Sequence, residues 1–164
     1  MSGNDSLEGR IGYRFKKPEF LKRALIHASA QGAGGVTQDD VAYAQRLSWL
    51  GDSVLEMIVS DKLYRDFPRA TNEDLHNWSI RLTEDRTLAR VAKELGLESV
   101  MVIGESLRLD PGALDRHVML ADALEAVLAA IYVDGGLQSA QGVVQKIFAG
   151  DFLSLLKFVH PSEK

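Results

Sequence analysis

Three acidic residues, Asp52, Asp122 and Glu125, carry the clearest chemical signal in this sequence. Asp52 follows Gly51 within a strongly apolar stretch, where burying a carboxylate is costly unless it is paired or bound to a metal. Asp122 and Glu125 stand three residues apart in a second apolar stretch, so they share one face if that stretch is helical. Flanking alanines would let another helix approach closely. Acid pairs at this spacing also occur on the polar edges of ordinary helices, and spacing alone leaves that alternative open.

If the two stretches meet, their carboxylates suit a hard divalent cation such as Mg²⁺ or Mn²⁺. Such an ion can activate water and stabilise a phosphoryl transition state. The chain has no cysteine, which excludes disulfides and thiolate ligands, so any metal must be held by oxygen or histidine.

Two long helices are expected to carry these acids. An apolar stripe over residues 41–67 predicts a long buried helix that ends at Pro68. Residues 119–132 are strongly apolar and stop at the Asp-Gly-Gly of residues 134–136, and an amphipathic stretch follows over 137–158. The acids of the two stretches therefore belong to separate helices.

The rest of the chain also follows a helical pattern. Pro18 begins a predicted helix of about three turns, and the glycines of residues 31–40 indicate a loop. Thr71 and Asp74 resemble a capping signal for one or two helices that end at Gly96. Residues 97–115 suggest a short helix or turn followed by a loop. No segment alternates polar and apolar residues, so we predict one all-α domain over residues 1–164, with its core at about 7–158.

Composition limits the possible functions. A chain of 164 residues that is 46% hydrophobic can bury a sizeable core. The net charge of −4 argues against a protein that binds nucleic acid mainly through an overall positive charge. No stretch approaches the roughly 20 apolar residues that cross a bilayer, and the first residues lack a signal-peptide pattern. We therefore expect a cytoplasmic protein without a membrane partner.

Four segments, taken in order, resemble the ribonuclease III family over nearly the entire chain, from about residue 7 to 158. They are residues 24–29, the signature helix around residues 47–55, Thr87-Leu88-Ala89, and residues 120–136. The resemblance implies a ribonuclease III-type all-α domain that dimerises and cuts double-stranded RNA with Mg²⁺, leaving 5′-phosphate and 3′-hydroxyl ends. It implies that Asp52 and Glu125 are catalytic and that, with Asp122, they bind the metal, Mg²⁺ or Mn²⁺.

The sequence departs from the family at three acidic positions. Family members resembling this chain have glutamates where Gln45, Ser48 and Asn72 stand. Glu73 is adjacent to the last of these, but one residue on a helix turns a side chain by about 100°. Losing anionic ligands should weaken divalent binding. The mini-ribonucleases III, a sister group, also resemble this chain in carrying a small residue where Ser48 stands, which keeps catalysis credible.

Trp49 matches a bulky family residue that inserts into the partner subunit, so the resemblance implies a homodimer with Trp49 as its anchor. Core packing of this side chain is the alternative. His27 is expected to be structural, because no partner at metal-ligand spacing lies nearby in the sequence. The other histidines are expected on the surface: His76, His117 and His160.

Two basic clusters are more typical of solvated faces than of phosphate contacts. They comprise Lys16, Lys17, Lys22 and Arg23, and then Arg81, Arg86 and Arg90. No segment after residue 158 resembles a double-stranded RNA-binding domain, so RNA binding is expected to be weak and salt-sensitive.

Three functions remain in view. The first is a metal-dependent double-stranded RNA endonuclease with attenuated activity. The alternative is a catalytically inactive RNA-binding or scaffold protein that keeps the dimeric fold. A structural helical dimer without an RNA partner ranks last.

Overall fold

The computed structural model describes residues 3–109 and 116–158, and these residues form helices and no strand. One isolated parallel bridge joins Ile26 to Val102. The predicted all-α class is confirmed. The helices are α1 (Gly3–Ile11), α2 (Pro18–Ala24), α3 (Gln38–Asp66), α4 (Asn72–Thr83), α5 (Asp85–Glu94), α6 (Glu105–Leu109), α7 (Arg116–Ile147) and α8 (Ala149–Leu155), with 3-10 turns at Ala28–Ala30, Leu97–Ser99 and Leu156–Phe158.

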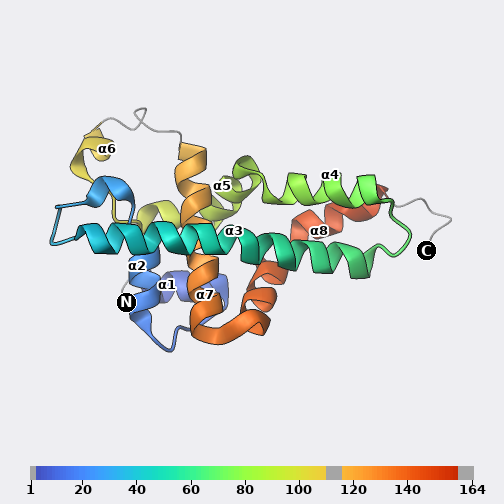
Figure 1. Ribbon diagram of the computed structural model, residues 1–164, viewed down its shortest axis with the longest axis horizontal. Helices are drawn as coiled ribbons and strands as arrows, with labels where there is room; N and C mark the ends of the chain where they lie inside the picture. The colour runs from blue at the N-terminus through green and yellow to red at the C-terminus, as the bar shows by residue number, and fades with distance from the viewer. Residues whose placement is uncertain (1–2, 110–115, 159–164) are drawn as a thin grey trace.

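Helices α3 and α7 form the centre of the molecule and cross each other (Figure 1). Their backbones are in contact at the crossing. A methyl group added at Gly51 would overlap the backbone carbonyl of Glu125, so only glycine allows this close approach. Helix α5 packs along α7, and α2 packs against both central helices. The α3–α7 pair is therefore the frame on which the other elements are placed.

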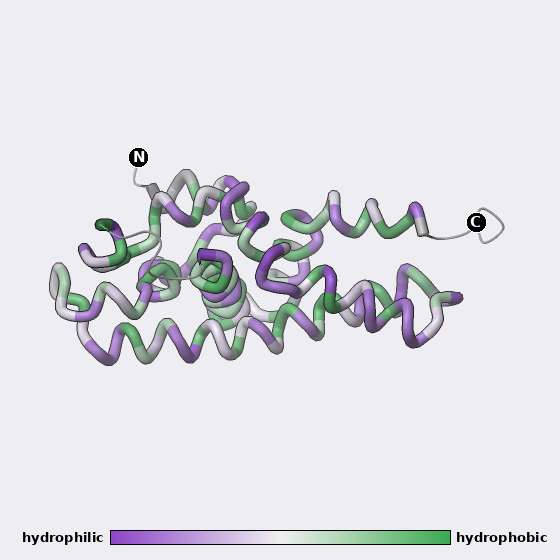
Figure 2. Tube along the Cα trace, turned by 90° about the horizontal axis from the view of Figure 1, so that it is seen from above, coloured by the Kyte–Doolittle hydropathy of each residue, from purple (hydrophilic) through white to green (hydrophobic). Residues whose placement is uncertain are grey.

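The interior of the described residues is apolar, and no polar or charged residue among them is buried. Leucines, alanines and valines of α3, α5 and α7 make up most of this core. Hydrophobic and hydrophilic positions alternate along the helices, as expected where each helix turns one face inward (Figure 2).

Several boundaries differ from those expected from sequence. Helix α2 ends at Ala24 and is shorter than three turns, because the chain becomes extended to pair Ile26 with Val102. The predicted long helix begins earlier, at Gln38, because Thr37 and Asp40 form a capping box there. Helix α1 was not expected, although Leu7 and Ile11 on it are fully buried.

The two capping predictions in the middle of the chain are confirmed. Thr71 and Asp74 form a capping box at the start of α4. Gly96, in the left-handed region with φ 69°, follows the last turn of α5. The expected short helix is α6, and the loop expected after it falls partly at residues 110–115, outside the described residues.

The predicted stop at residues 134–136 is a kink within α7, at Gly136 with φ 81°. Asp134 accepts hydrogen bonds from the hydroxyl of Tyr13 at 2.7 Å and from the backbone amides of Lys16 and Lys17. This anchor fixes the kink against the segment between α1 and α2, so the helix changes direction there and continues.

Across the described part of the chain, every helix is too short or too polar to cross a membrane.

Candidate active site

The crossing of α3 and α7 brings together the acids predicted from the sequence. Asp52 follows the contact residue Gly51 on α3, and Asp122 and Glu125 lie on α7, one turn apart. Asp52 and Asp122 are exposed and Glu125 is half-buried. All three acids therefore lie on a face that solvent reaches, and none is fully buried within the apolar helices.

Ser48 connects the two helices within this site. It lies one turn before Asp52 on α3, and its hydroxyl donates a hydrogen bond to Oε2 of Glu125 at 3.1 Å. The same hydroxyl is close enough to Asp122 to lower the pKa of that carboxyl. A hydroxyl has one proton to donate, and the 3.1 Å contact assigns it to Glu125. Ser48 thus holds a carboxylate in place without adding charge.

The electrostatics of the site are those of crowded carboxylates. Burial, and to a smaller extent the like charges of Asp52, Asp122 and Asp85, raise the pKa of Glu125 to about 7, while the hydrogen bond from Ser48 opposes this rise. Burial and then the charge of Asp85 raise the pKa of Asp122. Glu125 is thereby poised to gain or lose a proton near neutral pH.

Asp85 is the acidic residue that sequence analysis missed. It is the first residue of α5, which packs along α7, and its charge raises the pKa values of Asp122 and Glu125. The available sequence signal was its place two residues before the family-like Thr87-Leu88-Ala89 run. That signal is weak, because acids are common in the first turn of a helix, where their negative charge stabilises the helix itself.

Oxygen donors of this kind fit Mg²⁺ or Mn²⁺, which hard carboxylate ligands select. Within residues 3–109 and 116–158, no three Asp, Glu or His side chains stand close enough to form a ready-made metal cage. Mg²⁺ commonly keeps several waters and takes only one or two carboxylates directly. The residues therefore fit a hydrated divalent ion better than a fully coordinated one.

The three positions where the resemblance implies family glutamates lie in two separate places. Gln45 is exposed on α3, one turn before Ser48, and belongs to the same face as Asp52. Asn72 begins α4 beside the far end of α3, roughly 20 Å from Asp52 at 1.5 Å per helical residue (Figure 1). Within one chain, Asn72 is therefore not part of the acidic site.

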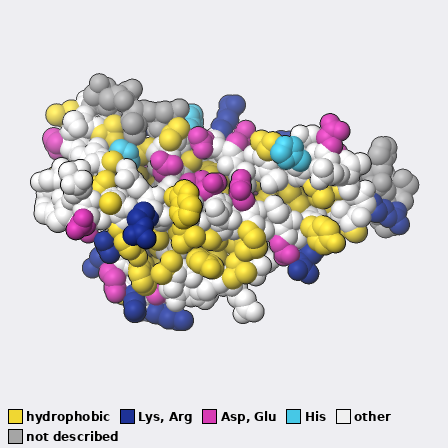
Figure 3. Space-filling model, viewed as in Figure 1, with side chains coloured by type: hydrophobic (Ala, Val, Ile, Leu, Met, Phe, Trp, Pro, Cys, Tyr) yellow, Lys and Arg dark blue, Asp and Glu magenta, His cyan; other side chains and the backbone are white. Residues whose placement is uncertain are grey.

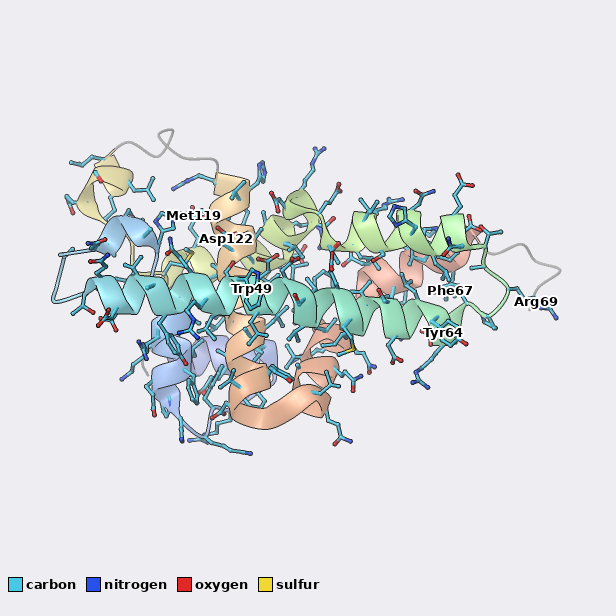
Figure 4. All side chains as sticks on the ribbon, in the orientation of Figure 1. Trp49, Tyr64, Phe67, Arg69, Met119 and Asp122 are labelled. Carbon is cyan, nitrogen blue, oxygen red and sulfur yellow. The ribbon has the colours of Figure 1, made fainter. Side chains whose placement is uncertain are left out.

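Trp49 is 76% exposed, so core packing is not its role. Acidic and hydrophobic side chains adjoin on the face shown in Figure 3, and Figure 4 labels Trp49 on α3 in the same orientation. Next to it is an open hollow of about 380 Å³, whose wall includes Trp49, Ser48, Met119 and Asp122. Figure 4 shows Trp49, Met119 and Asp122 near the crossing of α3 and α7. An exposed aromatic beside a hollow suits contact with another surface.

His27 also lines this hollow, but the hydrogen bonds of its side chain are local. Its Nδ1 accepts from the backbone amide of Ser29 at 3.1 Å, and the hydroxyl of Ser29 accepts from the amide of Gly104 at 2.9 Å. Burial lowers the pKa of His27, which favours the neutral ring. These contacts agree with the structural role expected for it.

The remaining basic and histidine residues are mostly placed on the surface, as expected. Two arginines of the basic clusters are engaged within the chain: Arg90 pairs with Glu94 and Asp151, and Arg23 stacks on Tyr43 and lies 3.6 Å from Asp40. The exposed residues are Lys16, Lys17, Lys22, Arg81, Arg86, His76 and His117, while His160 lies outside the described residues.

Comparison with known proteins agrees with this all-α frame and its acidic face. The profile of the ribonuclease-III-like family matches residues 17–151. The chain belongs to the ribonuclease-III-like family. It is 39% identical over 150 residues to ribonuclease 3 of Magnetococcus marinus and 35% identical over 146 residues to ribonuclease 3 of Vibrio cholerae.

Those alignments cover 90% and 89% of this chain but 61% and 60% of the relatives, so the chain spans about three fifths of their length. The nuclease domain of ribonuclease III from Campylobacter jejuni superposes with a TM-score of 0.78 at 26% identity, over 91% of this chain and 98% of that domain. Dicer from Pichia stipitis shares the fold, with a TM-score of 0.63 at 22% identity over 88% of this chain and 61% of that one.

Proposed function

We propose that this chain is the nuclease domain of a divalent-metal-dependent endonuclease that cuts double-stranded RNA, with attenuated activity. The observation that carries the proposal is the convergence of Asp52, Asp122 and Glu125 at the α3–α7 crossing, in a chain of the ribonuclease-III-like family. Membership of the family supports the class of reaction, and the cluster of acids supports the place in the fold where the reaction occurs.

The roles of the residues follow from their chemistry. Asp52, Asp122 and Glu125 would hold the cation, and Ser48 orients the Glu125 carboxylate. A bound Mg²⁺ or Mn²⁺ supplies positive charge that activates water and stabilises the phosphoryl transition state. Ser48 is neutral where family members carry a glutamate, so the affinity for the ion is lower and cleavage is slower.

We further propose that the active form is a homodimer in which Trp49 contacts a second copy. Trp49 is exposed beside an open hollow, and two-fold symmetry would place each tryptophan against the same region of the partner. The Campylobacter jejuni nuclease domain is described as having a region involved in dimer formation, which supports this assembly. Each protomer would then face one strand of the RNA duplex.

The test is cleavage of a labelled perfect RNA duplex, first with Mg²⁺ and then with Mn²⁺, with both product ends mapped. We expect cuts that leave 5′-phosphates and two-nucleotide 3′ overhangs. A DNA duplex of the same sequence controls for non-specific nuclease, and Glu125→Gln controls for a contaminant. Intact RNA with both ions, in the presence of folded protein that binds the duplex, would contradict the proposal.

A second candidate is a catalytically inactive RNA-binding or scaffold protein. Ser48 and Gln45 at family glutamate positions favour it, as does the lack of a ready-made metal cage in the described residues. The two candidates differ in divalent binding. Calorimetry that detects no Mg²⁺ or Mn²⁺ binding at millimolar metal, together with retained RNA binding, would favour the inactive protein.

A further inference from the structure

A second open hollow, the basic groove, lies between α5 and the start of α7. Its volume is about 440 Å³, and its walls include Arg86, Arg90 and Lys93 of α5 and His117 of α7. Positions 86, 90 and 93 are four and three residues apart, so their side chains share one face of α5. The sequence placed Arg86 and Arg90 in a basic cluster, and the packing of α5 along α7 adds Lys93 and His117.

Two of these cations have no partner within the chain. Arg90 is engaged, because it lies 2.8 Å from Glu94 and 2.5 Å from Asp151, and this network also neutralises the Glu94 carboxylate in the groove. Arg86 and Lys93 are exposed, and in the part of the chain that the structure describes neither has an ion pair, a hydrogen bond or a ring contact. They stand roughly 10 Å apart along α5, at 1.5 Å per residue.

One further acid lines the groove. Glu84 is the N-cap residue of α5, where a negative charge stabilises the start of the helix. It precedes Arg86 by two positions, and side chains two positions apart on a helix do not face each other. With Glu94 engaged by Arg90, the groove carries a net positive charge, in a chain whose overall charge is −4.

The basic groove lies within reach of a strand that is bound at the acids. His117 precedes Asp122 by five residues and Glu125 by eight on α7, which is roughly 8 Å and 12 Å along the helix axis. A double-stranded nucleic acid carries a phosphate on each strand for roughly every 3.4 Å of its axis. A strand with one phosphate at the acids therefore brings further phosphates of the same strand to the groove.

We propose that Arg86 and Lys93, with His117 at the edge, contact the phosphate backbone of the RNA duplex and hold it beside the acids. The inference rests on the proposed nuclease function and deepens it, by naming where the substrate is held away from the cut. Separated cations suit a polymer with regularly spaced anions, and the nearby carboxylates repel that polymer, so a local basic surface is needed to hold it. Phosphate contacts position a duplex without reading its sequence.

The experiment is fluorescence anisotropy of a labelled RNA duplex with the full chain, in metal-free buffer over a series of KCl concentrations. Arg86→Gln combined with Lys93→Gln should weaken binding about tenfold at low salt, because two phosphate contacts are lost. The slope of the logarithm of affinity against the logarithm of salt should become shallower by about 0.9 for each contact, or about 1.8 per protomer.

The matched control is Arg14→Gln combined with Lys22→Gln. It removes the same two charges from exposed residues near α1 and α2, which lie on the other side of α3 (Figure 1). This control should bind within about twofold of the wild type and keep its salt slope, because charges far from the duplex are screened.

Two further measurements separate phosphate contact from a structural role. Arg86→Lys combined with Lys93→Arg keeps both charges and should retain the wild-type salt slope, because that slope counts phosphates neutralised rather than side-chain shape. Without RNA, Arg86→Gln combined with Lys93→Gln should melt within about 2 °C of the wild type, since exposed side chains without partners contribute little to stability.

The outcomes are distinguishable. Equal losses in the two charge-removing variants, or an unchanged slope in the variant of the groove, would overturn the inference, while cleavage by the wild type leaves the proposed function intact. Polyglutamate that displaces the labelled duplex as well as unlabelled RNA does would overturn the assignment to a phosphate backbone. A wild type that neither binds nor cuts the duplex would overturn both. If the wild type cuts RNA but binds it too weakly for anisotropy, the KM of cleavage over the same salt series gives the comparison.

Discussion

The two helices that build the acidic site differ in how far they follow the family pattern. Helix α7 carries Asp122 and Glu125, whereas α3 carries Asp52 together with the neutral Ser48 and Gln45, at positions where the resemblance implies glutamates. The backbone contact between the helices is nevertheless tight at Gly51. The comparison shows that the geometry of the crossing and the charge on it are separate properties. Side chains on one helix can change while the packing that positions both helices stays the same.

The largest expected effect comes from breaking the crossing itself. Gly51→Ala should destabilise the fold by more than about 3 kcal/mol, because its methyl group would overlap the Glu125 backbone and force α3 from α7. Urea unfolding followed by circular dichroism measures this. Gly142→Ala on α7 is the control, since nothing lies within 4 Å of the added methyl group, and it should be neutral or stabilising. Equal stability of the two variants would refute the close crossing.

Most of the fold could be predicted from the sequence because it depends on local signals. The apolar stripe of α3 and the capping box at Thr71 and Asp74 are read directly from residue spacing. The kink at Gly136 was predicted as the end of a helix. The sequence shows the glycines, but it does not show the three hydrogen bonds that Asp134 accepts and that hold the helix at the kink. Helix α1 was missed because its burial depends on contacts with distant segments.

The site was only partly predictable, for the same reason. Asp122 and Glu125 share a face by spacing alone, and Asp52 joins them through the resemblance. Asp85 comes from a separate helix, so only tertiary packing reveals it. The exposure of side chains could not be predicted from the sequence either. Trp49 lies in an apolar stretch, yet its side chain is on the surface.

The next effect concerns the exposed α3 face beside the acids. Trp49→Ala should raise the dissociation constant of the homodimer about 30-fold, corresponding to roughly 2 kcal/mol for a central aromatic anchor. Sedimentation velocity over a concentration series measures it. Tyr64→Ala is the matched control, because Tyr64 is also exposed, at 74%, near the other end of α3. A dimer with a dissociation constant of about 10⁻⁶ M would persist at roughly tens of micromolar protein. A wild type that is monomeric at that concentration would therefore refute the dimer.

Restoring charge to α3 tests the comparison directly. Ser48→Glu should raise Mg²⁺ affinity and cleavage about tenfold, because it places a carboxylate one turn before Asp52 on the same face. Gln45→Glu should matter less, since it lies a further turn away. The control is Ser60→Glu, which adds the same charge to α3 roughly 18 Å from position 48.

The same RNA duplex assay should show that adding Glu125→Gln to Ser48→Glu abolishes the gain. If Ser48→Glu folds and dimerises but changes neither metal affinity nor cleavage, position 48 is not a lost ligand position. Cleavage that appears only in Ser48→Glu would mark the wild type as an inactive member of the family.

The smallest effect concerns the acids retained on α7. The pKa of Glu125 is about 7 in the folded protein and 4.5 for an ordinary glutamate, so the folded state binds more protons between these values. Stability should therefore fall as pH rises from about 4.5 to 7 in metal-free buffer. Glu125→Gln removes this loss and should be about 1 kcal/mol more stable than the wild type at pH 8, after discounting for solvent exposure.

That difference corresponds to roughly 3 °C in melting temperature for a chain of this size. It should vanish near pH 4.5, where the wild-type glutamate is protonated, and the glutamine oxygen can still accept the hydrogen bond from Ser48. Mg²⁺ should stabilise the wild type at pH 8 but not near pH 4.5, because the ion requires the ionised carboxylate. Glu73→Gln, on exposed α4, should show neither effect. A pH-independent difference between wild type and Glu125→Gln would mean that Glu125 is not crowded by acids, and that α7 carries them for packing alone.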